Sequence, residues 1–118
     1  MNAVELEKRL IHYASRIIGI VEELPDGIAA KHLGGQLVRS GTSPALNYGE
    51  VRGAESTKDF VHKMRICLKE LRETHVCLQI IQDRNWFADG KLDSILAETN
   101  ELISIFVASL KTAVNRRG

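Results

Sequence analysis

A seven-residue repeat of core-type side chains between residues 60 and 81 constrains this chain more than any other feature. The repeat alternates spacings of three and four, which is the period of one face of an α-helix. Ser56 followed by Asp59 resembles an N-terminal capping box, and the pattern ends near Arg84. The segment is therefore predicted to be a long amphipathic helix whose buried face is Phe60, Met64, Cys67, Leu71, Thr74, Leu78 and Ile81.

Three further segments have the same helical period. The first runs from about residue 3 to 24 and ends at Pro25, because proline cannot continue a helix. The second runs from about 28 to 52, and Pro44 is expected to kink or split it. The last runs from about 91 to 115. The expected core positions are Leu6, Leu10, Tyr13, Ile17, Ile20 and Leu24 in the first segment and Leu92, Leu96, Ile103, Phe106, Leu110 and Ala113 in the last.

Four amphipathic segments with short connections predict an all-α fold, an antiparallel up-and-down four-helix bundle. The 118 residues fit one domain, 1–118, that can bury a real core. Trp86 and Phe87, in the connection before the last helix, are expected to cover one end of that core. The chain lacks any strand pattern, repeat of domain size or low-complexity tract.

Composition narrows the possible partners. The formal net charge is only +1, so a nucleic-acid partner would need a local basic patch. No apolar run approaches the ~20 residues of a membrane span, and no signal peptide is recognisable, so we expect a cytoplasmic protein without a membrane partner. Cys67 and Cys77 lie ~15 Å apart along one predicted helix, which excludes a disulfide within the chain.

Enzymatic chemistry has little support in the sequence. Metal sites in helical bundles use repeated Glu-x-x-His pairs, whereas this chain has a single carboxylate–histidine pair at that spacing, Asp59 and His62. No glycine-rich loop joins a strand to a helix, so no phosphate cradle is expected. We therefore predict a non-enzyme with no metal and no cofactor.

One basic face could bind nucleic acid. Lys58, Arg65, Lys69 and Arg72 recur with His62 on one face of the third helix, roughly opposite its apolar face. Such a stripe can follow a phosphate backbone. The alternative is an ordinary solvated face, in which neighbouring acids such as Asp59 and Glu73 neutralise the cations.

A polar stripe marks the second helix. Its members share one helical face at spacings of three and four: Gln36, Ser40, Ser43, Asn47 and Glu50, with Arg39 beside them. The stripe either satisfies its own hydrogen bonds inside the fold or forms a ligand or partner site. We expect Asn47 and Glu50 to be largely buried, with Arg39 as a charge partner within the bundle or across a subunit contact, because an unpaired buried charge is costly.

The same residues carry a family resemblance. Residues 36 to 78 resemble the 23S rRNA intervening-sequence protein family, also labelled ribosomal-protein-like, in the strings Arg39-Ser40-Gly41-Thr42-Ser43-x-x-x-Asn47-Tyr48-x-Glu50, Ala54-Glu55-Ser56-x-x-Asp59-Phe60-x-x-Lys63 and Leu68-Lys69-Glu70-x-x-Glu73-Thr74. The resemblance carries over as motif positions Arg39, Ser40, Ser43, Asn47, Glu50, Glu70 and Glu73. The chain departs from the pattern at Pro44 and Gly49, and at Val76 and Cys77, where the family often has two aromatic residues.

The resemblance implies an up-and-down bundle that assembles into a ring-like homo-oligomer, typically a pentamer, with no established enzymatic activity. A similar bundle accompanies reverse transcriptases of diversity-generating elements, which implies nucleic-acid binding. Apolar residues beyond the core faces, including Ile11, Ile18 and the run 102–110, independently favour self-association. We expect an adaptor that binds RNA or another nucleic acid. The competing hypothesis is a protein-interaction scaffold with no nucleic-acid role.

Overall fold

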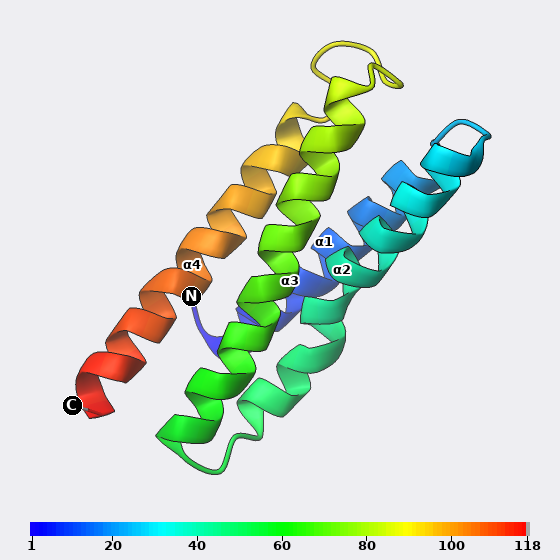
Figure 1. Ribbon diagram of the computed structural model, residues 1–118. Helices are drawn as coiled ribbons and strands as arrows, with labels where there is room; N and C mark the ends of the chain where they lie inside the picture. Colours follow the sequence, from blue (N-terminus) through cyan, green and yellow to red (C-terminus); the bar gives the residue numbers. More distant parts are fainter. Residues whose placement is uncertain (118) are drawn as a thin grey trace.

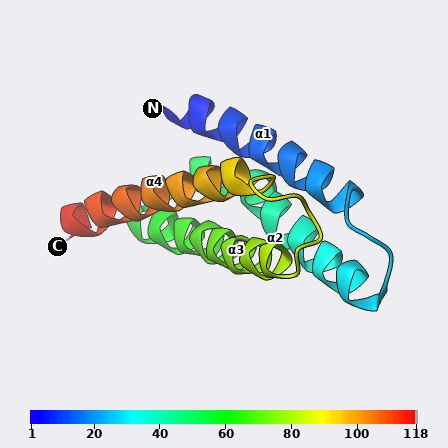
Figure 2. The same cartoon turned by 90° about the horizontal axis from the view of Figure 1, so that it is seen from above.

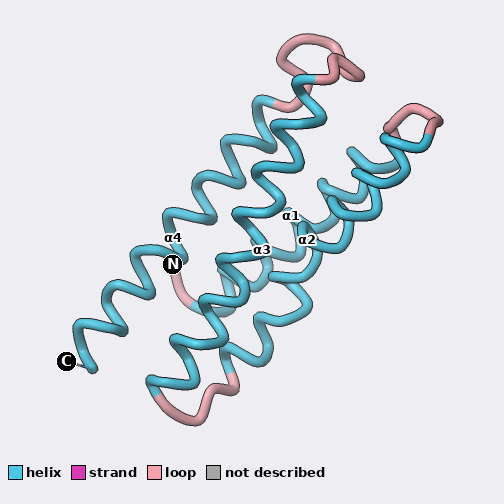
Figure 3. The backbone as a smooth tube through the Cα atoms, viewed as in Figure 1, coloured by secondary structure: helices cyan, strands magenta, loops and turns pink. Residues whose placement is uncertain are grey.

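The computed structural model describes residues 1–117, which form four α-helices joined by short loops (Figures 1 and 3). The helices are α1 (Ala3–Glu22), α2 (Ile28–Arg52), α3 (Thr57–Asp83) and α4 (Asp93–Arg117). Each helix packs on its neighbour in sequence, and α1 also contacts α4, which closes the bundle. No strand occurs in this part of the chain. The predicted all-α, antiparallel up-and-down bundle is confirmed.

The apolar face predicted on α3 lies at the centre of the core. Its residues from Met64 to Ile81 are all buried, and only Phe60, at the first turn, is half-buried. The face predicted on α1 is buried in the same way, apart from the half-buried Leu24. Ser56 caps α3 as expected, because its side chain accepts a hydrogen bond from the Asp59 amide at 3.0 Å.

On α4 the buried face differs from the predicted one. Ile95 and Leu102 are buried, whereas the predicted Leu96 and Ile103 are half-buried at its edge. Thr99 lies between the buried pair and is itself fully buried. Its hydroxyl donates to the carbonyl of Ile95 at 2.7 Å, which satisfies it inside the apolar core. The predicted Leu92, Phe106, Leu110 and Ala113 are buried, so the prediction is wrong only at the two positions on either side of Thr99, where the buried residue comes one position earlier.

Close packing of α1 against α2 depends on a glycine. A Cβ atom at Gly41 would lie 2.7 Å from a methyl carbon of Ile17, which is too close for any ordinary contact. The absence of a side chain therefore lets the two helices approach. The predicted split at Pro44 does not occur, since α2 is continuous from Ile28 to Arg52 with Pro44 buried inside it.

The seam between α1 and α4 is the loosest in the bundle. The two helices diverge toward the N-terminus of α1 (Figure 2). Where they meet, Arg9 donates to both carboxylate oxygens of Glu98 at 2.8 and 2.7 Å. The hydroxyls of Tyr13 and Thr99 lie 2.6 Å apart next to this pair and are buried. Polar contacts thus hold this seam together where apolar packing is thin.

Several apolar side chains lie outside the core. Val4, Ile11 and Ile18 recur every seven residues on α1 and are 48%, 56% and 42% exposed, as the wide apolar pattern predicted. Trp86 and Phe87 are half-buried against the core, as expected. Every helix within residues 1–117 falls short of the length and apolarity that a membrane crossing requires.

Candidate nucleic-acid interface

The four cations of the predicted basic face are all solvent-exposed. Lys58, Arg65, Lys69 and Arg72 lie on α3, opposite the face that the core buries. From Lys58 to Arg72 they extend over fifteen residues, whose fourteen steps correspond to about 21 Å of helix. The helix thus presents a continuous row of positive charge to solvent.

The acidic residues beside this face pair with other cations. Asp59 accepts a hydrogen bond from Lys63 at 3.0 Å, and this bond lowers the pKa of the Asp59 carboxyl. Glu70 and Glu73 both bind Arg39 of α2, at 3.0 and 2.6 Å. Within residues 1–117, no carboxylate lies within 4.0 Å of the four cations of the basic face. These four cations thus form no ion pair in the described chain, although Lys69 lies close enough to Glu73 to help lower the pKa of that carboxyl.

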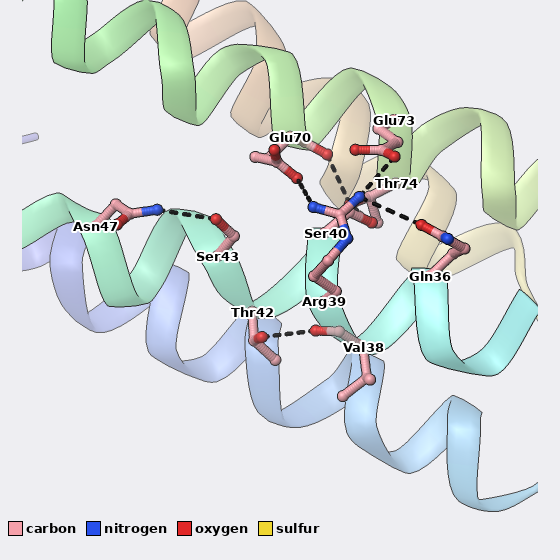
Figure 4. Close-up of polar contacts among 10 residues, drawn as sticks. All are labelled: Gln36, Val38, Arg39, Ser40, Thr42, Ser43, Asn47, Glu70, Glu73 and Thr74. Atoms are coloured by element: carbon pink, nitrogen blue, oxygen red, sulfur yellow. Dashed lines mark hydrogen bonds and ion pairs between the residues drawn. The ribbon is translucent and has the colours of Figure 1, made fainter.

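Arg39 joins α2 to α3 at the edge of the polar stripe (Figure 4). Its hydrogen bond lowers the pKa of Glu73, so this carboxylate stays ionised when the pH falls moderately. The bond to Glu73 also raises the pKa of Arg39. Arg39 is about half exposed, so its ion pairs with Glu70 and Glu73 add little to the stability of the bundle. Their main effect is to fix how α2 and α3 lie against each other.

Beneath Arg39, the two helices share a buried hydroxyl pair. The Thr74 hydroxyl lies 2.8 Å from the Ser40 hydroxyl and 2.8 Å from the carbonyl of Glu70 (Figure 4). Both side chains are fully buried, so the pair satisfies groups that would otherwise be costly to bury. Ser40 is the one member of the polar stripe that lies in the core.

The expectation for the far end of the stripe is wrong in part. The Glu50 side chain is 73% exposed, and its ion pair with Lys63 is long, at 3.8 Å. Asn47 is half-buried and donates to the Ser43 hydroxyl at 2.9 Å. Arg39 pairs with the carboxylates of α3 and not with Glu50. The stripe follows the flank of α2 beside α3, so only its middle faces the interior.

A groove borders the far end of the polar stripe. It has a volume of about 190 Å³ and lies between α2 and α3. Asn47 and Glu50 line it from α2, and His62, Lys63 and Ile66 line it from α3. The groove thus places the amide and carboxylate of the stripe beside Lys63 and His62, and the four cations of the basic face lie outside its lining. No cluster of metal-ligating residues occurs in the part of the chain described.

The contacts that complete this surface were missed from sequence. The charge partners of Arg39 lie 31 and 34 residues away on α3, and only the antiparallel pairing brings them together. A signal did exist, because Glu70 and Glu73 are three residues apart and so share a helix face. Val76 and Cys77 stand where the family often has two aromatic residues. Val76 is exposed on the same side of α3 as the basic face, whereas Cys77 is buried.

Comparison with known proteins agrees with the four-helix fold. A family model described as 23S rRNA-intervening sequence protein matches residues 3–108. A crystal structure of a protein of unknown function from the S23 ribosomal protein family of Bacteroides thetaiotaomicron is similar, with a TM-score of 0.83 and 26% identity. The similarity covers 94% of this chain and 99% of that one. A search of curated proteins finds no match.

Proposed function

The chain belongs to the 23S rRNA-intervening sequence protein family, and we propose that it is a non-catalytic, oligomeric bundle that binds structured RNA through the basic face of α3. The observation that supports this is electrostatic. Four exposed cations share one helix face, while the acids beside them pair with Lys63 and Arg39. Exposed cations that form no ion pair bind phosphates favourably, because each neutralised phosphate releases condensed counterions.

Assembly would strengthen such a weak surface. The exposed Val4, Ile11 and Ile18 form a row along α1, away from the basic face of α3, and a second copy of the chain can cover it. We infer a homo-oligomer of five subunits, in which the basic face recurs once per subunit. Several weak patches that engage one RNA together raise the overall affinity well above that of one patch.

A protein-interaction scaffold is the second candidate. Val76 and Ile80 are 55% and 43% exposed on α3, near the C-terminal end of the basic row. Exposed apolar residues beside cations suit an acidic protein partner as well as a nucleic acid. In this alternative the cations select a carboxylate-rich surface, and RNA has no role.

A salt titration separates the two. We would measure the affinity for a fluorescently labelled RNA hairpin between 50 and 300 mM salt, concentrations that bracket the range in which phosphate contacts weaken steeply. Four phosphate contacts per bound subunit predict a slope of log K against log salt of roughly −3 to −4. The double variant Lys69→Glu and Arg72→Glu should reduce the affinity and flatten this slope.

A charge-matched control uses Lys8→Glu and Lys111→Glu, which change the net charge by the same amount on α1 and α4. The control should bind RNA nearly as well as the parent protein. No RNA binding at low salt, or equal loss in both double variants, would favour the scaffold. Unfolding curves for all three proteins would show that neither pair of substitutions disturbs the bundle.

A further inference from the structure

A second candidate site lies at the end of the bundle that carries the loop between α2 and α3 (Figure 1). A cavity of about 460 Å³ opens there, where α1 and α4 have diverged (Figure 2). This volume falls within the range of small-molecule sites. Val51 of α2, Phe60 of α3 and Ala113 of α4 give it apolar walls.

A buried tyrosine has an unused hydroxyl at this cavity. Tyr48 lines the cavity, is 5% exposed and packs its ring edge against Phe106. Its hydroxyl has no hydrogen-bond partner among the side chains of residues 1–116, yet no buried side-chain nitrogen or oxygen of those residues is left unsatisfied. The hydroxyl must therefore reach the open space of the cavity. Burial raises the pKa of Tyr48, so the hydroxyl keeps its proton and remains a donor.

The mouth of the cavity carries two guanidinium groups. Arg52 and Arg116 line it together with one acid, Glu55. One nitrogen of Arg52, Nη1, donates to Glu7 at 2.7 Å, and the other donors of this guanidinium have no acceptor in the described part of the chain. Arg116 is exposed and forms no ion pair within that part. Two guanidinium groups thus face an apolar cavity that has a phenol donor in its wall.

We propose that this cavity binds a small amphipathic anion, whose hydrocarbon body contacts Phe60 and Ala113 and whose carboxylate or phosphate accepts hydrogen bonds from Tyr48 and the two arginines. A neutral ligand would leave the guanidinium donors unused, and a wholly polar anion would leave the apolar walls exposed to water. The site is separate from the basic face of α3 and does not depend on RNA binding.

Calorimetric titration with octanoate tests the proposal, with 1-octanol as the neutral analogue and octyl phosphate as the alternative anion. Both anions should bind at least about tenfold more tightly than the alcohol, because hydrogen bonds to a charged group are stronger than those to a neutral one. The ratio of the two anion affinities identifies which headgroup the site prefers. Equal affinities for octanoate and octanol would overturn the proposal, as would the absence of binding by both anions.

Variants locate the site. Tyr48→Phe and Arg116→Gln should each weaken octanoate binding roughly tenfold, and Ala54→Trp, at the half-buried wall of the cavity, should abolish it by filling the space. Arg84→Gln removes the same charge at the opposite end of the bundle and should have no effect. Octanoate binding that survives Ala54→Trp would place the ligand elsewhere and refute this site. RNA affinity should be unchanged in Tyr48→Phe, so the two proposals can fail independently.

Discussion

The Ser40 hydroxyl of α2 lies 2.8 Å from the Thr74 hydroxyl of α3, and both side chains are fully buried. These two groups are the only polar side chains that the α2–α3 interface places in the core of the described chain. Arg39 covers them with its ion pairs to Glu70 and Glu73. The family motif thus forms a layered contact between two helices, with hydroxyls inside and charges outside.

Thr74→Val should destabilise the bundle by ~1–3 kcal/mol, because it leaves the buried Ser40 hydroxyl without its partner. The double variant Ser40→Ala with Thr74→Val should lose less stability than the two single variants lose together, since no hydroxyl without a partner remains. Urea unfolding followed by circular dichroism measures all three. Strict additivity would show that the two hydroxyls do not depend on each other.

Gly41→Ala should destabilise the protein by ~1–3 kcal/mol, because the new methyl group would overlap the Ile17 side chain. Gly35→Ala is the matched control in the same helix, since a Cβ there meets no atom within 4 Å. The control should stabilise the protein by up to ~1 kcal/mol through helix propensity. Thermal unfolding of both variants checks the opposite signs, and a stabilising Gly41→Ala would contradict the close approach of α1 and α2.

Alkaline pH should weaken the bundle through Tyr13. Burial raises the pKa of Tyr13 well above its ordinary value of 10. The unfolded chain therefore loses this proton first, so the stabilisation is complete below pH 10 and declines as the pH rises above it. Between pH 10 and 12, the free energy of unfolding should decrease less steeply with pH in Tyr13→Phe than in the parent protein. A parallel pH dependence in both proteins would assign the alkaline loss to other groups.

Acidic pH should also weaken the contact between α1 and α4. The Arg9 hydrogen bonds lower the pKa of Glu98 below its ordinary value of 4.5. The resulting stabilisation is present above pH 4.5 and is lost as the pH falls through the lower, folded-state pKa. Glu98→Gln should make stability less dependent on pH below 4.5. Urea midpoints at a series of pH values measure this, and an unchanged dependence would count against the ion pair.

Arg39→Met should weaken RNA binding even though Arg39 is outside the basic face. Without Arg39, Glu73 becomes free to pair with Lys69, four residues earlier on the same helix. Adding Glu70→Gln and Glu73→Gln to Arg39→Met should restore the affinity measured in the hairpin titration. A triple variant as weak as Arg39→Met would show that Arg39 contacts the RNA directly.

The α1 row should control assembly. Ile18→Glu places a charge in the middle of the row and should dissociate the oligomer without unfolding the bundle, because Ile18 is exposed in the single chain. Ile28→Glu, at the 91%-exposed start of α2, is the control and should leave assembly unchanged. Light scattering and circular dichroism measure the two properties separately. A parent protein that is monomeric at micromolar concentration would refute the assembly itself.

The sequence by itself determined the helices and most of the core. The apolar periods on α1 and α3 predicted their buried residues correctly, because those faces are continuous and a helix has a fixed period. The exposure of the basic row followed from the same geometry, since it lies opposite a buried face. The capping residue Ser56 was also visible, because capping depends on local spacing alone.

Tertiary structure decided what depends on contacts between helices. Arg39 was expected to be a charge partner of the polar stripe but binds Glu70 and Glu73 of α3. Thr99 was not among the predicted core residues of α4 and is buried there, where its hydroxyl lies 2.6 Å from that of Tyr13. The spacing within one helix cannot encode which residue of another helix lies opposite, so the partners, the register of α4 and the cavity at Tyr48 appear only when the helices pack.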